Sequence, residues 1–193
     1  MCGRDIINGD LSSEELERII DEVNRANPGG SIKTSGEIYP TDLAPVLAMS
    51  RAMNPRPFAM GWGYMLPDGK PVFNARSETA AQKPMFRDGM RQRRCAVPAT
   101  GYFEWEHTAS RTKYAISPGA GLFFMAGIYR LEGGAPHFSI LTRQSAEQIA
   151  FIHSRMPVIL PGELVRDWLN PKYDADELLR HAVLSVAYAP AEN

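Results

Sequence analysis

The chain has 193 residues, 44% of them hydrophobic and 22% charged, with a formal net charge of −1. This composition is typical of one globular domain, and it excludes a surface that is basic throughout, so a nucleic-acid contact requires a local basic patch. The first residues, MCGRDIINGD, lack the apolar run of a signal peptide, and no stretch approaches the roughly 20 apolar residues that span a bilayer. We therefore expect a cytoplasmic protein without a membrane anchor.

A helix is predicted from Leu11 to Ala26. Ser12 and Glu15 have the spacing of a capping box, and Leu11 with Leu16 has the spacing of a hydrophobic staple. The segment NPGG that follows ends the helix. Apolar residues recur at helical spacing and predict a buried face: Leu16, Ile19, Ile20 and Val23.

Short apolar or aromatic runs fill roughly residues 37 to 142, among them LAPVLAM and LFFMAGIYRL, and turn-forming clusters such as SPGAG separate them. Because no long helical period intervenes, antiparallel pairing into a sandwich or barrel is favoured over βαβ units. Near the end, one short helix is predicted from Ser145 to about His153, another around Leu164 to Leu169, and a third after Asp174. These elements predict a single α+β domain over residues 1–193.

The two cysteines, Cys2 and Cys95, do not form a disulfide framework, and both are expected to be free thiols. Cys95 lies in a strand-like stretch and is expected to be a small buried hydrophobe. Removal of Met1 would leave Cys2 with a thiol and a free α-amine, a pair that can condense with an aldehyde or attack an amide. The histidines show no metal-binding spacing, so no metal site and no cofactor are expected.

Two polar motifs follow apolar runs and allow two interpretations each. In NARSETA, Asn74 offers donors and an acceptor and Arg76 offers a fork suited to phosphate, although a capped turn with a surface arginine is the simpler interpretation. In GYFEWE, Glu104 alternates with Phe103 and Trp105. It is either exposed to solvent or a buried carboxyl whose raised pKa allows proton transfer near neutrality.

Two further segments combine basic residues with other chemistry. In HSRMP, His153 is either a charged helix cap or a general acid, with Arg155 as a phosphate ligand. The stretch from Met85 to Arg94 holds four arginines with Met85, Phe86 and Met90 among them. Such a run is usually a solvated face, but it is also compatible with stacked bases beside a phosphate-binding groove.

In this order along the chain, MCGR, WGYMLP, NARSETA, CAVPATGYFEW and HSRMP resemble the SOS response-associated peptidase family, proteins that crosslink to abasic sites in single-stranded DNA. The resemblance implies a β-rich, barrel-like core with flanking helices. It also implies a cofactor-free, monomeric enzyme of the DNA damage response, associated with the nucleoid when bound to DNA. Its Cys2 would form a thiazolidine with the ring-opened abasic site, with lyase or self-reversal activity and autoproteolytic removal of Met1.

The resemblance also implies roles for individual residues. Cys2 would be the nucleophile, and Asn74 would hold the reacting sugar or the cysteine amine. Glu104 would shuttle protons during ring opening and Schiff-base formation, and His153 would assist ring opening and reversal. DNA contacts are expected for Arg4, Arg76 and Arg155 at phosphates, for Pro40 and Trp105 near a kink, and for Met85 and Phe86 in the arginine-rich run.

Three departures from the family pattern predict weaker or altered DNA binding. Glu37 stands where an asparagine is expected ahead of Pro40, and a carboxylate there would repel phosphates. After WGYMLP the chain reaches Asn74 through a short loop without the further tryptophan that would offer a stacking platform. The end of the chain, LSVAYAPAEN, lacks the expected VN pair.

Two other functions are compatible with parts of the sequence. Class II glutamine amidotransferases also begin Met-Cys-Gly, so an N-terminal-nucleophile thiol hydrolase is an alternative, although 193 residues leave no room for an attached synthase domain. A non-catalytic module that binds single-stranded DNA through the arginine-rich run is the third possibility. That module would bind in a salt-dependent way and independently of Cys2.

Overall fold

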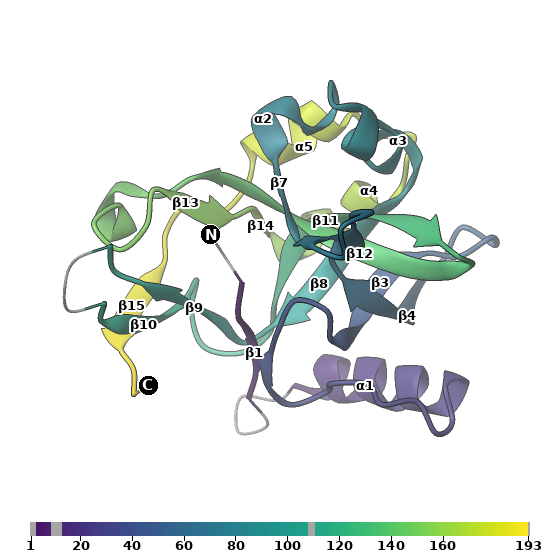
Figure 1. Ribbon diagram of the computed structural model, residues 1–193, viewed down its shortest axis with the longest axis horizontal. Helices are drawn as coiled ribbons and strands as arrows, with labels where there is room; N and C mark the ends of the chain where they lie inside the picture. Colours follow the sequence, from purple (N-terminus) through teal and green to yellow (C-terminus); the bar gives the residue numbers. More distant parts are fainter. Residues whose placement is uncertain (1–2, 9–12, 108–110, 193) are drawn as a thin grey trace.

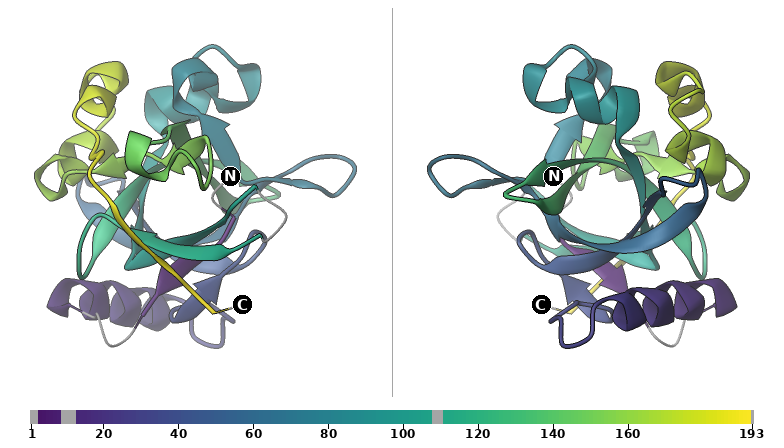
Figure 2. Two further views of the ribbon diagram at one scale, coloured as in Figure 1. Left: turned by 90° about the vertical axis from the view of Figure 1, so that its left-hand side faces the viewer. Right: turned by 90° about the vertical axis from the view of Figure 1, so that its right-hand side faces the viewer.

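A closed five-stranded barrel forms the centre of the molecule (Figures 1 and 2). The structure is a computed structural model, and it describes residues 3–8, 13–107 and 111–192. The barrel is closed because its last strand along the chain has a barrel strand on each side. That strand forms a hairpin with the barrel strand before it and also pairs with the second barrel strand of the chain. The barrel strands are β3 (Leu43–Met49), β4 (Pro55–Trp62), β8 (Arg94–Ala99), β11 (Phe123–Glu132) and β12 (Ala135–Gln144), in the order β12-β4-β3-β8-β11.

Short strands extend this barrel along β12 and β11. β7 (Asn74–Arg76) and β13 (Arg155–Pro157) both pair with β12, and β14 (Ile159–Leu160) pairs with β11. A separate small hairpin joins β5 (Tyr64–Met65) to β6 (Pro71–Val72). The expected α+β fold with a barrel-like core is therefore confirmed, and nearly all of its strand pairs are antiparallel.

A second sheet of five strands adjoins the barrel. Its strand order is β15 (Ala187–Pro190), β10 (Lys113–Ser117), β9 (Gly101–Trp105), β1 (Asp5–Ile7) and β2 (Gly36–Ile38). Only Thr100 separates β8 of the barrel from β9 of this sheet, and its hydroxyl accepts a hydrogen bond from the Asn8 N–H at 2.8 Å. The position of β9 therefore follows directly from the closure of the barrel.

Large side chains fill the barrel interior. Trp62 and Phe138 stack with centroids 5.9 Å apart, and the Trp62 indole donates a hydrogen bond to the Phe73 carbonyl at 3.1 Å. Cys95 is fully buried in β8, and burial raises the pKa of its thiol, so the thiol stays protonated and inert. The prediction of a small buried hydrophobe at Cys95 is confirmed.

Helix α1 (Glu14–Ala26) covers β4 and β3 (Figure 1). The predicted buried face is confirmed for Leu16, Ile19 and Val23. The predicted cap is wrong by one residue, because the hydroxyl of Ser13, not of Ser12, accepts the hydrogen bond from the Leu16 N–H at 3.2 Å. Leu11 and Ser12 lie outside the described residues.

Two helices interrupt the region that was predicted to contain strands alone. They are α2 (Ser77–Ala80) and α3 (Pro84–Gln92). Pro84 occupies the first turn of α3, where its missing N–H costs nothing, and Phe86 and Met90 bury one face at helical spacing. The prediction missed α3 because its arginines were taken as a surface run and not as the polar face of a helix.

The helices near the end of the chain are shorter than predicted. After Ser145 there is only a 3-10 turn, η2 (Glu147–Ile149), whose cap residue Ala146 has no side-chain acceptor. The next elements are η3 (Gly162–Leu164), α4 (Val165–Leu169) and α5 (Ala175–Arg180). The predicted cap of α5 is confirmed, because Asp174 accepts a hydrogen bond from the Glu177 N–H at 2.8 Å. Among the helices of the described chain, none has the length and apolarity that crossing a membrane requires.

Gly127 in β11 tests how tightly the barrel is packed. A β-carbon at this position would lie 2.9 Å from the Cys95 sulfur and 3.3 Å from the Ser139 carbonyl oxygen. We therefore expect Gly127→Ala to lower the free energy of unfolding by about 1–3 kcal/mol, measured by urea denaturation. Gly119→Ala is the control, because nothing lies within 4 Å of the added atom. Equal stability of the two variants would contradict the proposed close packing.

Candidate active site

The pairing of β1 with β9 brings the start of the described chain beside Glu104. Asp5 lies opposite Tyr102, and the Phe103 N–H donates a hydrogen bond to the Arg4 carbonyl at 2.9 Å. The strands are antiparallel, so Gly3, the residue ahead of Arg4, lies toward the Glu104 end of β9. Cys2, the predicted nucleophile, lies outside the described residues.

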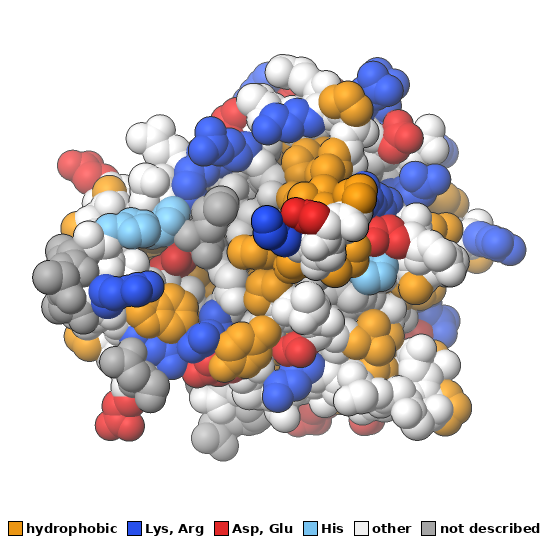
Figure 3. Space-filling view, in the orientation of Figure 1, with side chains coloured by type: hydrophobic (Ala, Val, Ile, Leu, Met, Phe, Trp, Pro, Cys, Tyr) orange, Lys and Arg blue, Asp and Glu red, His pale blue; other side chains and the backbone are white. Residues whose placement is uncertain are grey.

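Two ring contacts join the β9–β10 hairpin to the segment that carries His153. The rings of His107 and His153 have centroids 4.8 Å apart. Tyr114, which lies opposite Glu104 in the register of β9 and β10, meets Phe151 with centroids 5.7 Å apart. The structure therefore brings Glu104 and His153, which are far apart in sequence, into one region. Figure 3 shows this face, where histidine side chains lie over β13 and basic side chains gather above and below them.

Glu104 points to the inner face of its strand. Its side chain shares that face with Tyr102, and only 4% of Glu104 is exposed. Burial raises the pKa of its carboxyl to about 7, because the charged form loses its hydration. Of the two interpretations open from the sequence, the structure supports the buried carboxyl. Such a group can donate or accept a proton at neutral pH.

His153 is uncharged at neutral pH. Burial, together with the neighbouring His107, lowers the pKa of its ring to about 4. Nδ1 of the ring lies 2.9 Å from the Arg155 backbone nitrogen and 3.2 Å from the Arg155 carbonyl oxygen. A charged helix cap is therefore excluded. The ring is oriented by the backbone of the same segment that carries Arg155.

Asn74 and Arg76 lie on β7, which is held against β12. Asn74 is opposite Ile140 and is half-buried, whereas Arg76 is opposite Thr142 and is exposed. β13, which begins at Arg155, pairs with the same end of β12 on its other side. The two motifs NARSETA and HSRMP therefore flank one strand, and the Thr142 hydroxyl donates a hydrogen bond to the Ala75 carbonyl at 3.4 Å.

Glu78 occupies the guanidinium fork of Arg155. The two nitrogens of Arg155 donate hydrogen bonds to the two carboxylate oxygens at 2.7 and 2.8 Å, and one of them also donates to the Thr142 carbonyl at 2.6 Å. These bonds from Arg155 hold the pKa of Glu78 at about 2. Sequence reasoning missed this partner, although Glu78 stands inside the NARSETA motif and is the acidic residue nearest to Arg76. Arg155 can reach a phosphate only by sharing or leaving this carboxylate.

Arg4 lies between two aromatic rings. Its guanidinium carbon is 4.6 Å from the centroid of Tyr39 and 4.5 Å from that of Trp105, and it forms an ion pair with Glu37 at 3.2 Å. The stacking on both faces fixes the plane of the guanidinium. The predicted contacts Arg4 and Trp105 are thus one structural unit, and Pro40 follows Tyr39 directly with a half-buried side chain.

Glu37 also binds Lys113, a residue that sequence reasoning missed. The Lys113 ammonium is 2.9 Å from Glu37 and 4.0 Å from the centroid of Phe103, and 5% of its side chain is exposed. Burial opposes ionisation of Glu37, but the hydrogen bonds from Lys113 and Tyr39 lower its pKa. Glu37 is therefore ionised between two cations, so this group of three charges is net positive.

Met85 and Phe86 face the interior. Phe86 is 5% exposed and packs on Tyr64 with centroids 5.8 Å apart, and Met85 packs against the same core. Arg94, the last arginine of the run, is also buried and donates hydrogen bonds to the Asn170 and Tyr173 carbonyls. The run therefore presents arginines of α3 to solvent, while the residues expected to stack on bases stabilise the helix.

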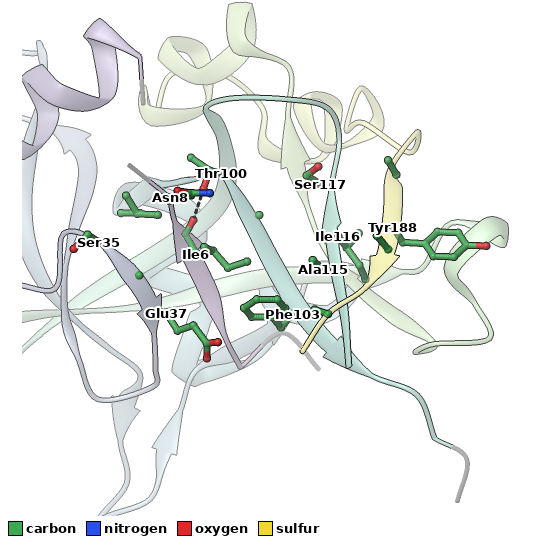
Figure 4. Close-up of a pocket in the computed structure, with 16 residues that line it drawn as sticks. Ile6, Asn8, Ser35, Glu37, Thr100, Phe103, Ala115, Ile116, Ser117 and Tyr188 are labelled. Atoms are coloured by element: carbon green, nitrogen blue, oxygen red, sulfur yellow. Dashed lines mark hydrogen bonds between the residues drawn. The ribbon is translucent and has the colours of Figure 1, made fainter. Parts of the chain in front are cut away.

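A mainly apolar groove of about 620 Å³ crosses the outer face of the second sheet (Figure 4). It shares Phe103 and Glu37 with the surroundings of Arg4, and Glu37 is the only charged side chain among the described residues that line it. Because Glu104 alternates with Phe103 along β9, its carboxyl lies on the other face. Any proton transfer by Glu104 would therefore take place on the inner face of the second sheet and not in this groove. Within the described ranges, no group of three or more metal-ligating side chains was found.

The raised pKa of Glu104 predicts how stability depends on pH. The unfolded chain releases this proton near pH 4.5 and the folded protein near pH 7, so the folded state loses stability as the pH rises between these values. The free energy of unfolding of Glu104→Gln, relative to that of wild type, should therefore rise by up to about 3 kcal/mol between pH 4.5 and pH 7. Above pH 7 this difference should stay constant.

Chemical denaturation at a series of pH values measures this difference. The control is Glu163→Gln, since Glu163 is exposed and should follow the wild-type curve. Parallel curves for wild type and Glu104→Gln would show that the carboxyl is not desolvated.

Comparison with known proteins identifies the family. The model of the SOS response associated peptidase (SRAP) family matches residues 1–191. The abasic site processing protein YobE of Bacillus subtilis is 31% identical, with 98% of this chain and 97% of that protein aligned. The abasic site processing protein HMCES of Xenopus tropicalis is also 31% identical, over 61% of this chain and 44% of its own.

The fold also matches solved structures. A crystal structure of a protein from Bacteroides thetaiotaomicron superimposes with a TM-score of 0.80 at 23% identity, and covers 100% of this chain and 93% of its own. A phage-related protein from Bordetella bronchiseptica superimposes with a TM-score of 0.76 at 23% identity, covering 100% and 95%. Together with the family match over almost the whole length, these findings show that the chain belongs to the SOS response associated peptidase family.

Proposed function

We propose that this protein processes abasic sites in single-stranded DNA by forming a covalent thiazolidine crosslink through Cys2. The observation that carries the proposal is the buried carboxyl of Glu104, whose pKa is about 7. It lies in the same region as the neutral ring of His153, at the end of β9 toward which Gly3 lies. Relatives that align over nearly the whole chain are named abasic site processing proteins, which supports the same substrate.

The chemistry begins with the sugar of the abasic site, a cyclic hemiacetal. Transfer of its hydroxyl proton to a base and protonation of the ring oxygen open the ring and give an aldehyde. After removal of Met1, the α-amine of Cys2 adds to this aldehyde and a Schiff base forms with loss of one water. The thiol then adds across the C=N bond, its proton passes to nitrogen, and the five-membered thiazolidine closes. With pKa values of about 8 for the amine and about 8.5 for the thiol, both groups are partly reactive near neutrality.

Glu104 and His153 divide the proton transfers of these steps. Glu104 is close to half ionised at neutral pH, so it can accept a proton in one step and return it in the next. His153 is neutral, so its ring can form a hydrogen bond with a sugar oxygen without adding a charge. Asn74 would hold the sugar or the amine through its amide. Reversal and lyase activity would proceed through the same Schiff base.

Recognition must rest on the backbone, because the site has no base to contact. Arg4, Arg76 and Arg155 are proposed to bind phosphates, and Trp105 and Pro40 to contact the bent strand. Single-stranded DNA is the proposed partner, because its backbone can bend into the region between β7 and β9, and the protein is proposed to act as a monomer in the cytoplasm. The only peptide bond that this function requires to be cleaved is the one after Met1.

Intact-mass spectrometry tests the proposal. Wild-type protein should lack the mass of Met1 and, after incubation with an abasic oligonucleotide, should gain the mass of that oligonucleotide less one water. Cys2→Ala should form no adduct, whereas Cys95→Ala should still form it, because the Cys95 thiol is buried and protonated. An oligonucleotide with thymine at the same position is the substrate control.

Adducts that persist in Cys2→Ala would refute the proposal. Release of ammonia from glutamine without any reaction on DNA would favour the thiol-hydrolase alternative. Equal, purely salt-dependent binding by wild type and Cys2→Ala, with no adduct in either, would favour a non-catalytic DNA-binding module.

The Arg155–Glu78 pair predicts a variant with stronger binding. Glu78→Gln removes the carboxylate that competes with phosphate for the guanidinium fork. We expect tighter binding of single-stranded DNA and a steeper salt dependence, by about 0.7 in the log–log slope, as for one additional phosphate contact. Fluorescence anisotropy over a range of salt concentrations measures both. The control is Glu22→Gln, which breaks a surface ion pair between Glu22 on α1 and Arg56 on β4. This variant should leave the slope unchanged. An unchanged slope in Glu78→Gln would show that Arg155 only supports the fold.

A further inference from the structure

Three aromatic side chains form a cluster at the edge of the second sheet, and they are called here the aromatic triad: Tyr114 on β10, Phe151 after η2, and Tyr188 on β15. Their ring centroids lie 5.4 to 5.9 Å apart, and each pair meets edge to face. Phe151 is 49% exposed and Tyr188 is 44% exposed, although both are large apolar side chains. Tyr114 packs against the core, so the triad extends from the core to the surface, where Phe151 and Tyr188 are exposed.

Two members of the triad, Tyr114 and Phe151, lie near residues of the candidate active site. Tyr114 lies directly opposite Glu104 in the antiparallel register, and such pairs have β-carbons about 4.5–5.5 Å apart on one face. Phe151 precedes His153 by two residues on the segment whose ring contacts join it to the hairpin. The strand register and these ring contacts thus link the exposed rings to the elements that carry the carboxyl and the imidazole. Tyr188 also lines the apolar groove at the edge of the sheet, and its ring extends outward beyond β15 (Figure 4).

The geometry of the rings leaves room for a further flat partner. In an edge-to-face contact one ring uses its edge, so the faces of that ring are still available for stacking. A nucleobase stacks on such a face whatever its identity, and this contact is typical of proteins that bind single strands without reading the sequence.

We propose that the aromatic triad binds the unpaired base of one nucleotide that flanks the abasic site. This inference depends on the proposed function, because the position of the flanking nucleotide is set by the abasic sugar at Glu104 and His153. The triad stacks on the base without discrimination and directs the strand along the edge of β10 and β15. A base is favoured over a protein partner because the strand register and the ring contacts link the triad to the elements that are proposed to receive the DNA.

Equilibrium binding tests the triad separately from the covalent reaction. The probe is a labelled single-stranded oligonucleotide with a central tetrahydrofuran residue, which lacks the hydroxyl needed to open to an aldehyde. In a series of such probes, the base of one neighbouring nucleotide at a time is also removed. Wild type should lose about tenfold in affinity at one flanking position. The variant with Phe151→Leu and Tyr188→Leu should bind the complete probe about tenfold more weakly and lose nothing further at that position.

Controls separate this role from support of the fold. Tyr173→Leu removes a ring that is also 49% exposed, in the segment between α4 and α5, and should retain the wild-type pattern. If the double variant does not fold, Tyr188→Leu alone at the sheet edge gives the same comparison. Equal losses in wild type and variant at every position would overturn the proposal, as would a slower covalent reaction with no dependence on the flanking base. If wild type forms the adduct but its affinity does not depend on any flanking base, the proposed role of the triad is wrong and the proposed function still stands.

Discussion

The burial of Glu104 is the constraint on which the rest of the site depends. Its strand follows β8 after a single residue, so closure of the barrel fixes where the carboxyl lies. Tyr102 and Glu104 face inward while Phe103 and Trp105 face outward, and a shift of one residue in the pairing would exchange these sets. The same register that buries the carboxyl therefore places Trp105 against Arg4.

Carboxylates prepare the arginines of this surface for a ligand. Arg155 is held in a fork-to-fork pair by Glu78, and Arg4 is paired with Glu37 while two rings cover its faces. Each pair limits the conformational freedom of a long side chain. The carboxylate of the pair would also compete with a phosphate for the guanidinium. Because Glu37 also binds Lys113, the site retains a net positive charge where the sequence alone indicated repulsion of DNA.

The fold class and the elements with strong local signals could be predicted from the sequence. The apolar stripe of α1 and the strand of Cys95 depend on residues a few positions apart, and both predictions were confirmed. The error at α3 arose because its arginines were interpreted by charge and not by spacing, although Phe86 and Met90 mark a buried face. Long-range partners could not be predicted, because the Arg155–Glu78 pair joins residues 77 positions apart through two strands that share β12.

The site residues divide in the same way. Sequence reasoning left Glu104 between solvent and interior, because alternation defines two faces without saying which one is covered. Tyr114 lies opposite Glu104 in the register and meets Phe151 of a distant loop, so the covered face depends on how segments far apart in sequence pack together. Burial also keeps His153 neutral, and the ring of His107 lies against it. The same region of the fold thus shifts the pKa values of both groups toward their uncharged forms, a perturbation that is characteristic of functional sites.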